Sequence, residues 1–190
     1  SGCEESGLLK QFPVKQMLEF ATRRTPEDGS IGAQIYGTKM RSIVKSVDMV
    51  KPILTQQFVL AQTICSYGLV PIIEPEVPID HPDKELIEAM LFQELQEFLK
   101  EFDVKCILKL TPPEVPNLYH DFTGYRKVEK VVFLSGGYDT NEACNRLSLN
   151  DDVSASFSRA LSQDLYYSLT TDKFDAIISN NIKQITEASS

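Results

Sequence analysis

Residues 70–111 read VPIIEPEVPIDHPDKELIEAMLFQELQEFLKEFDVKCILKLT, and this stretch decides the fold class. It opens and closes on short runs rich in apolar residues, at 70–77 and 104–111. Between them, residues 83–102 repeat apolar side chains at the spacing of one helix face, and Asp83 is suited to cap that helix. A strand, a helix and a second strand in this order predict a βαβ unit with parallel strands.

The same alternation extends over the rest of the chain. Further strand-like runs occupy 35–41, 131–136 and 153–158, and helical periodicity occupies 48–68, 139–150 and 172–186. Most strand positions are apolar on both faces, which is typical of a parallel sheet covered by helices. Residues 1–190 contain no repeat and no low-complexity linker, so we predict one α/β domain, either a doubly wound sheet or a parallel (β/α)₈ barrel.

Composition narrows the classes of protein. A net charge of −8 argues against a nucleic-acid partner, and no apolar run is long enough to cross a membrane. The four cysteines, Cys3, Cys65, Cys106 and Cys144, are scattered and lie near neither histidine, so we expect reduced thiols, no metal and a cytoplasmic protein. His81 and His120 fall in connecting segments and are not expected to act as catalytic bases.

Polar side chains fall on one face of the predicted strands. Lys109 stands inside CILKLT (106–111), where a buried ammonium is costly unless it faces a polar space. Because strand side chains alternate with period two, charged and hydroxyl groups near the carboxyl end of successive strands share one parity. We therefore expect them to meet in one barrel mouth, where enzymes of this architecture place their active sites: Lys39, Arg41, Glu74, Glu76, Lys109 and Ser135.

This set of residue types indicates amine chemistry. A lysine near other cations in a partly desolvated pocket releases its proton more readily and becomes a nucleophile that can form a Schiff base with a ketone. A carboxyl group must then move protons, and Glu74 on the adjacent strand is suited to this. The reaction needs no metal and no cofactor.

Two further motifs predict phosphate binding. LSGGYDT (134–140) ends a strand and leads into a helix, so it presents backbone N–H groups to an anion. SFSRAL (156–161) follows the next strand, and its arginine is suited to bidentate contact. Ser135, Gly136, Ser158 and Arg159 thus predict one phosphate site, and Lys39 with Arg41 predict a second on the opposite side.

The motifs YGTKMRS, GLVPIIEPEV, ILKLTPP, VVFLSGGYDTNEA and SASFSRALSQDL together resemble class I fructose-bisphosphate aldolase, particularly its bacterial-type branch. The resemblance runs from about residue 7 to about residue 175. It implies that Lys109 is the Schiff-base lysine, Glu74 the main proton acceptor and donor, and Lys39 the second active-site lysine. It also implies that Arg41 binds the distal phosphate, that Glu76 supports the hydrogen bonds of the Schiff-base lysine, and that the site at 135–136 and 158–159 binds the ketone-side phosphate.

The chain supplies only about the last five βα units of such a barrel. Three hypotheses follow. In the first, the chain is the C-terminal portion of an aldolase that cleaves fructose 1,6-bisphosphate to dihydroxyacetone phosphate and glyceraldehyde 3-phosphate in glycolysis. In the second, it is a catalytically incompetent fragment that binds a partner, such as another copy in a homo-oligomer, through its unpaired strand edges. In the third, it is another lysine-dependent barrel enzyme, such as a transaldolase or deoxyribose-phosphate aldolase. The paired phosphate motifs disfavour the last.

Overall fold

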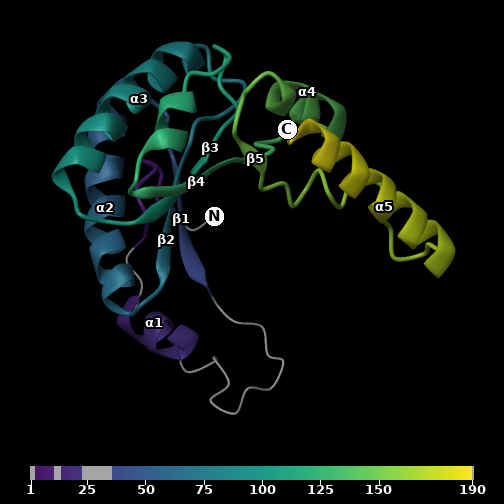
Figure 1. Cartoon of the computed structure of the whole chain (residues 1–190), viewed down its shortest axis with the longest axis horizontal. Coiled ribbons are helices and arrows are strands. Elements are labelled where there is room, and N and C mark those ends of the chain that lie inside the picture. Colours follow the sequence, from purple (N-terminus) through teal and green to yellow (C-terminus); the bar gives the residue numbers. More distant parts are fainter. Residues whose placement is uncertain (1–2, 11–13, 23–35, 190) are drawn as a thin grey trace.

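The computed structural model describes residues 3–10, 14–22 and 36–189, and five parallel strands form its single sheet. The strands follow one another across the sheet in chain order (Figure 1). A doubly wound sheet would reverse its strand order at a switch point, so this sequential order is that of a barrel. The strands are β1 (Gly37–Ile43), β2 (Val70–Glu76), β3 (Cys106–Leu110), β4 (Val128–Phe133) and β5 (Ser154–Ala155).

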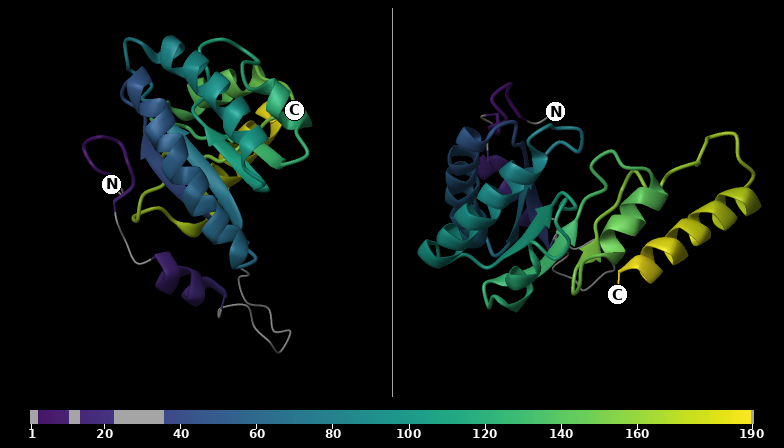
Figure 2. Two further views of the ribbon diagram at one scale, coloured as in Figure 1. Left: turned by 90° about the vertical axis from the view of Figure 1, so that its left-hand side faces the viewer. Right: turned by 90° about the horizontal axis from the view of Figure 1, so that it is seen from above.

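Helices alternate with these strands. Figure 1 shows α2 and α3 side by side on one face of the sheet, and Figure 2 shows α5 running along α4 and away from that pair. None of the helices in the described residues is long and apolar enough to cross a bilayer. The helices are α1 (Val14–Thr22), α2 (Val50–Ser66), α3 (Lys84–Glu101), α4 (Thr140–Ser148) and α5 (Thr171–Ala188), with short 3₁₀ turns at Val47–Met49 and His120–Gly124.

Local signals account for several helix ends. Asp139 caps α4, since its side chain accepts a hydrogen bond from the Glu142 backbone N–H at 2.8 Å. Pro52 lies in the first turn of α2, where its missing N–H costs little, and Gly68 follows that helix with φ of +73°. Asp83 precedes α3 as predicted, but its side chain makes no capping hydrogen bond.

The sheet turns alternate residues towards the helices. Leu108 and Leu110 are fully buried in the core, together with Ile73 and Phe133, whereas Lys109 between them is not part of that core. Each fully buried aliphatic side chain contributes about 1.5–3 kcal/mol to folding. The predicted alternation around Lys109 is confirmed.

Some boundaries differ from the predictions. The strand predicted at 131–136 is β4, which ends at Phe133, because Gly136 and Gly137 have positive φ angles and turn the chain. The run predicted at 153–158 forms only the two-residue β5, and the helix α1 was not predicted. The apolar spacing in 83–102 predicts both Leu86 and Ile87 on the buried face of the helix; Ile87 is buried there, but Leu86 is exposed. Residue 35 of the first predicted strand lies outside the described residues.

Cysteine reactivity is the first prediction. All four cysteines are free, and burial raises the pKa of the fully buried Cys106 to about 12. At pH 8 only about one Cys106 in ten thousand is then a thiolate. Iodoacetamide labelling with peptide mapping should find Cys106 unmodified after the partly exposed Cys65 has reacted.

The pKa shift also sets a sign for stability. The thiol of Cys106 keeps its proton to higher pH in the folded protein than in the unfolded chain. The contribution of this protonated thiol to the free energy of unfolding is therefore lost as pH rises from the ordinary thiol range towards 12. Early alkylation of Cys106 in the native protein would contradict this account of the core.

Candidate active site

A cavity of about 400 Å³ lies at the carboxyl end of the sheet, lined by residues of β1, β2 and β3 and of the segments that follow β4 and β5. All nine predicted site residues line it, together with Leu134 and Ser156. Ser156 was not predicted as a site residue, although it shares the parity of Ser158 in SFSRAL and could have been found in that way. The predicted residues in the cavity are Lys39, Arg41, Glu74, Glu76, Lys109, Ser135, Gly136, Ser158 and Arg159.

Lys109 and Glu74 form the centre of the site. The Lys109 Nζ lies 3.3 Å from Glu74 Oε1, and their side chains are only 11% and 3% exposed. The other carboxylate oxygen, Oε2, is buried without a hydrogen-bond partner among the described residues, and the Nζ of Lys39 lies 3.9 Å away. A buried carboxylate with one oxygen unengaged beside an amine is an arrangement suited to proton transfer.

Arg41 and Glu76 form a second pair beside the first. The guanidinium donates two hydrogen bonds to the carboxylate, from Nε at 2.6 Å and from Nη2 at 2.9 Å. The hydrogen bond to Glu76 raises the pKa of Arg41 above its usual value. Both oxygens of Glu76 are thus engaged by Arg41, whereas the resemblance implied a role for Glu76 beside the Schiff-base lysine.

Two side chains bind the backbone near the carboxyl end of β2. The strands β2 and β3 pair only at Ile72 with Ile107 and Ile73 with Leu108. Beyond this, Gln57 from α2 accepts from the Glu74 backbone N–H at 2.9 Å, and Thr111 bonds to both the N–H and the carbonyl of Val77. These contacts fix the backbone on both sides of the Lys109–Glu74 pair.

Gln57 was missed from the sequence, and a signal for it existed. Its amide also donates to the hydroxyl of Ser42 on β1 at 2.9 Å, and both residues are fully buried. In α2 it stands on the same face as Ile53, Leu54 and Ala61, so it is a polar residue on an otherwise apolar stripe. A residue of that kind must find partners in the core.

The loop after β4 has a backbone geometry suited to an anion. Gly136 and Gly137 have φ angles of +61° and +115°, and the Tyr138 N–H donates to the Ser135 carbonyl at 2.8 Å. A Cβ at position 136 would lie 2.9 Å from the Ile79 side chain, so both the angle and the space require glycine. The loop leads directly into the amino end of α4, which favours negative charge.

The charge of the cavity also favours an anion. Four cationic side chains face two carboxylates there, although the whole chain carries a net charge of −8. Lys39 and Arg159 are exposed and therefore accessible to a ligand. Focused positive charge of this kind raises the local concentration of anionic ligands.

The histidines lie elsewhere. The Nε2 of His81 lies 2.9 Å from the Lys45 carbonyl oxygen, and that of His120 lies 3.2 Å from Asp152 Oδ2; neither residue lines the cavity. The described residues contain no group of His, Cys, Asp and Glu side chains that could hold a metal ion.

Replacing His120 by Asn should leave any imine formation at Lys109 within about twofold of wild type, as borohydride trapping would measure; loss of trapping with the fold intact would contradict this.

Comparison with known proteins agrees with this geometry, although no family model matches the chain. Over 189 residues the chain is 46% identical to class 1 fructose-bisphosphate aldolase from Clostridium acetobutylicum, covering 97% of this chain and 62% of that protein. A solved structure of fructose-bisphosphate aldolase from Plasmodium falciparum, in complex with TRAP and a small-molecule inhibitor, matches with a TM-score of 0.68 at 20% identity. That match covers 93% of this chain and 61% of the solved one, and it shows a shared fold.

The chain therefore spans about three-fifths of the length of these relatives and has the fold of part of a (β/α)₈ barrel. The resemblance drawn from the motifs is confirmed: over 97% of its length, this chain is similar to part of a class 1 fructose-bisphosphate aldolase.

Proposed function

We propose that the chain is the portion of a cytoplasmic, glycolytic class I aldolase that carries the Schiff-base lysine and both phosphate sites. The whole protein would cleave fructose 1,6-bisphosphate to dihydroxyacetone phosphate and glyceraldehyde 3-phosphate. The observation that carries this proposal is the amine of Lys109, 3.3 Å from the buried carboxylate of Glu74, in a cavity that also contains a glycine-rich anion loop.

Lys109 supplies the nucleophile. Its neutral amine adds to the C2 ketone, and the resulting carbinolamine loses water to give an iminium. Glu74 donates the proton that leaves with the water and then removes the proton of the C4 hydroxyl. The C3–C4 bond breaks with its electron pair drawn into the iminium, which releases the aldehyde; protonation at C3 and hydrolysis release the ketone phosphate.

The two phosphates orient the sugar across this pair. The loop at Ser135 and Gly136, together with Ser158 and Arg159, holds the ketone-side phosphate, and Lys39 with Arg41 holds the distal one. Because these groups lie on opposite sides of Lys109 in the strand order, they fix the carbon chain over its amine. This use of two phosphate sites is what favours a bisphosphate over the substrates of other lysine-dependent aldolases.

A second candidate rests on the edges of the sheet. β1 and β5 lie at the two ends of the strand order and are not paired with each other, so the described sheet does not close. The alternative is a catalytically incompetent portion that binds a partner through these edges.

Borohydride reduction in the presence of radiolabelled dihydroxyacetone phosphate separates the two candidates. The proposed aldolase portion should become labelled with one ketone per chain. A chain that shows native helical circular dichroism but incorporates no label would refute imine formation and favour the binding role.

A further inference from the structure

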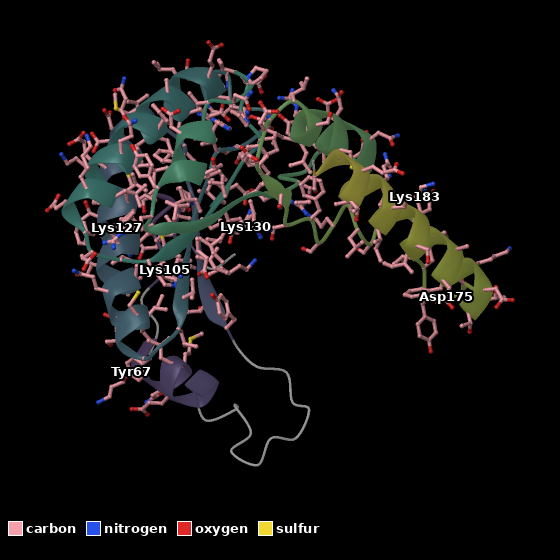
Figure 3. All side chains as sticks on the ribbon, in the orientation of Figure 1. Tyr67, Lys105, Lys127, Lys130, Asp175 and Lys183 are labelled. Atoms are coloured by element: carbon pink, nitrogen blue, oxygen red, sulfur yellow. The ribbon has the colours of Figure 1, made fainter. Side chains whose placement is uncertain are left out.

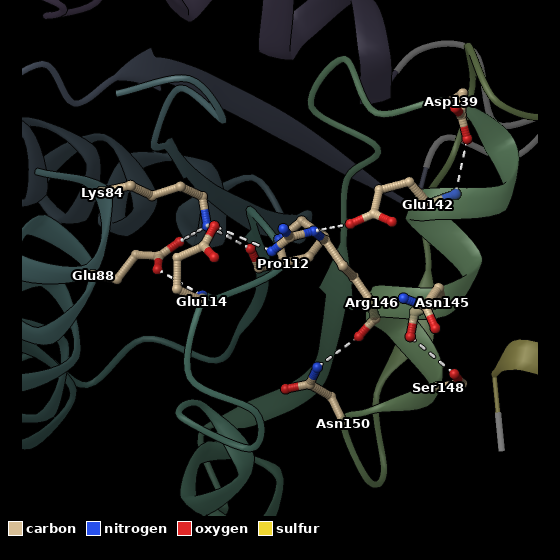
Figure 4. Close-up of polar contacts among 10 residues, drawn as sticks. All are labelled: Lys84, Glu88, Pro112, Glu114, Asp139, Glu142, Asn145, Arg146, Ser148 and Asn150. Carbon is tan, nitrogen blue, oxygen red and sulfur yellow. Dashed lines mark hydrogen bonds and ion pairs between the residues drawn. The ribbon is translucent and has the colours of Figure 1, made fainter. Parts of the chain in front are cut away.

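A chain of ion pairs outside the cavity joins α3, the loop after β3 and α4. Figure 4 shows these side chains pointing towards one another from three separate elements. Glu114 occupies the middle, since its Oε1 accepts from Lys84 Nζ at 3.0 Å and from Arg146 Nη1 at 3.1 Å. We call Lys84, Glu88, Glu114, Glu142 and Arg146 the interloop network.

The α3 end of the network fixes the loop that follows the Lys109 strand. Lys84 is 4% exposed at its side chain and donates to the Pro112 carbonyl at 2.8 Å as well as pairing with Glu88. Glu88 in turn accepts from the Glu114 backbone N–H at 2.9 Å. Burial alone would raise the pKa of Glu114, but Lys84 and Arg146 together lower it, so its carboxylate stays charged and bound to both cations.

The α4 end of the network reaches the glycine-rich loop. Arg146 Nε donates to Glu142 at 2.7 Å, and the guanidinium carbon lies 4.4 Å from the centre of the Tyr138 ring. Tyr138 closes the turn of that loop through its hydrogen bond to Ser135. Arg146 therefore contacts the last residue of the turn and, through Glu114, the loop after β3.

The glycine-rich loop needs such a support. Its two glycines give up more conformational freedom than other residues when the loop is held in one shape. The space for a Cβ at Gly136 lies 3.8 Å from the Thr111 methyl carbon, so the two loops lie against each other at the cavity. Arg146 contacts both Tyr138 and Glu114 and so holds the two loops in fixed positions relative to each other. It does this from outside the cavity, which it does not line.

We propose that Arg146 is a positioning residue that sets the affinity of the glycine-rich loop for a phosphate monoester. This inference rests on the proposed function for the identity of the ligand. Arg146 touches no substrate in this arrangement. It preorganises the backbone N–H groups of residues 135–137 and thereby affects phosphorylated ligands and not the amine chemistry of Lys109.

Arg146→Met is the test variant, because Met keeps an unbranched side chain over the Tyr138 ring but loses the ion pairs. Lys100→Met is the matched control, since it removes one cation from an exposed pair with Glu97 on α3. In borohydride trapping, Arg146→Met should raise the half-saturating concentration of dihydroxyacetone phosphate about tenfold. Trapping of unphosphorylated dihydroxyacetone should match wild type, and the control should match it for both ketones.

An unchanged half-saturation for the phosphorylated ketone would overturn the proposal, and so would an equal rise for both ketones, because the network would then act on the amine or on the fold. Arg146→Lys keeps the charge and should give a smaller shift in the same direction; it serves as the test if the Met variant fails to fold.

Binding of inorganic phosphate, followed by phosphorus NMR, separates this proposal from the proposed function. If the wild-type protein forms no adduct with dihydroxyacetone phosphate, the proposed aldolase function is wrong. The phosphate titration then tests the positioning role of Arg146 by itself. A rise in Kd of about tenfold in Arg146→Met relative to Lys100→Met supports the positioning role. Equal Kd values in the two variants contradict it.

Discussion

Replacing Lys109 by Met should abolish the trapping of dihydroxyacetone phosphate by borohydride. The imine requires a primary amine beside Glu74. The other amine of the cavity, Lys39, is 57% exposed at its side chain and lies 3.9 Å from Glu74, against 11% and 3.3 Å for Lys109. Met fills a similar volume on a strand whose flanking residues, Leu108 and Leu110, are fully buried, so the sheet should keep its packing. Radiolabel incorporation under saturating ketone is the measurement.

Lys105→Met is the matched control for this variant. Lys105 immediately precedes β3, at the opposite end of the strand from the cavity, and its side chain is 64% exposed beside Glu129 (Figure 3). The Lys105→Met variant loses the same charge by the same substitution and should keep full labelling. If Lys109→Met retained labelling while circular dichroism showed a native fold, Lys109 would be structural and the proposed chemistry would be wrong.

In the whole protein proposed above, replacing Glu74 by Gln should slow cleavage of fructose 1,6-bisphosphate by about 10²–10⁴-fold, the usual worth of general acid–base catalysis. The amide keeps the size of the carboxyl group and can still contact Lys109, but it cannot exchange a proton with carbinolamine or hydroxyl. Some imine should therefore still form, so labelling by dihydroxyacetone phosphate should persist while turnover falls.

Glu129→Gln is the control, since Glu129 also pairs with a lysine but lies on β4 outside the cavity. Turnover of the control should stay within about twofold of wild type. Equal turnover in Glu74→Gln and wild type would remove Glu74 from the mechanism; loss of labelling in Glu74→Gln would instead assign it to formation of the imine.

Strand parity explains why much of the site could be predicted. The period of two is fixed by backbone geometry, so a lysine flanked by leucines must face away from the helices that cover those leucines. Lys39, Glu74 and Lys109 met in one cavity because the same argument holds on three adjacent parallel strands. The glycine-rich loop could be predicted because backbone positions with positive φ angles favour glycine, and Gly136 and Gly137 are visible in the sequence.

The supporting contacts could not be predicted in this way. Gln57 reaches Glu74 over 17 residues and Arg146 reaches Glu114 over 32, and no local periodicity pairs them. Whether Glu76 would pair with Arg41 or lie beside Lys109 depends on side-chain positions across two strands. Register and rotamers set such contacts, and they are decided by tertiary packing.

Strand ends were the weakest predictions for a related reason. In 128–133 the exposed Glu129 and Lys130 interrupt the apolar run, so the strand was predicted to start at residue 131. Lys130 is nevertheless held in the strand by its pairing with Ile107 of β3, and Glu129 falls at the register shift between Cys106 and Ile107, where the pairing skips one residue of β4.

Peptide mapping of the borohydride-reduced adduct tests the central claim most directly. After reduction with dihydroxyacetone phosphate and proteolysis, mass spectrometry should find the added ketone on Lys109 and on no other lysine, Lys39 included. Modification of Lys39 in place of Lys109, or an even spread over exposed lysines such as Lys100 and Lys183, would contradict the assignment of the nucleophile.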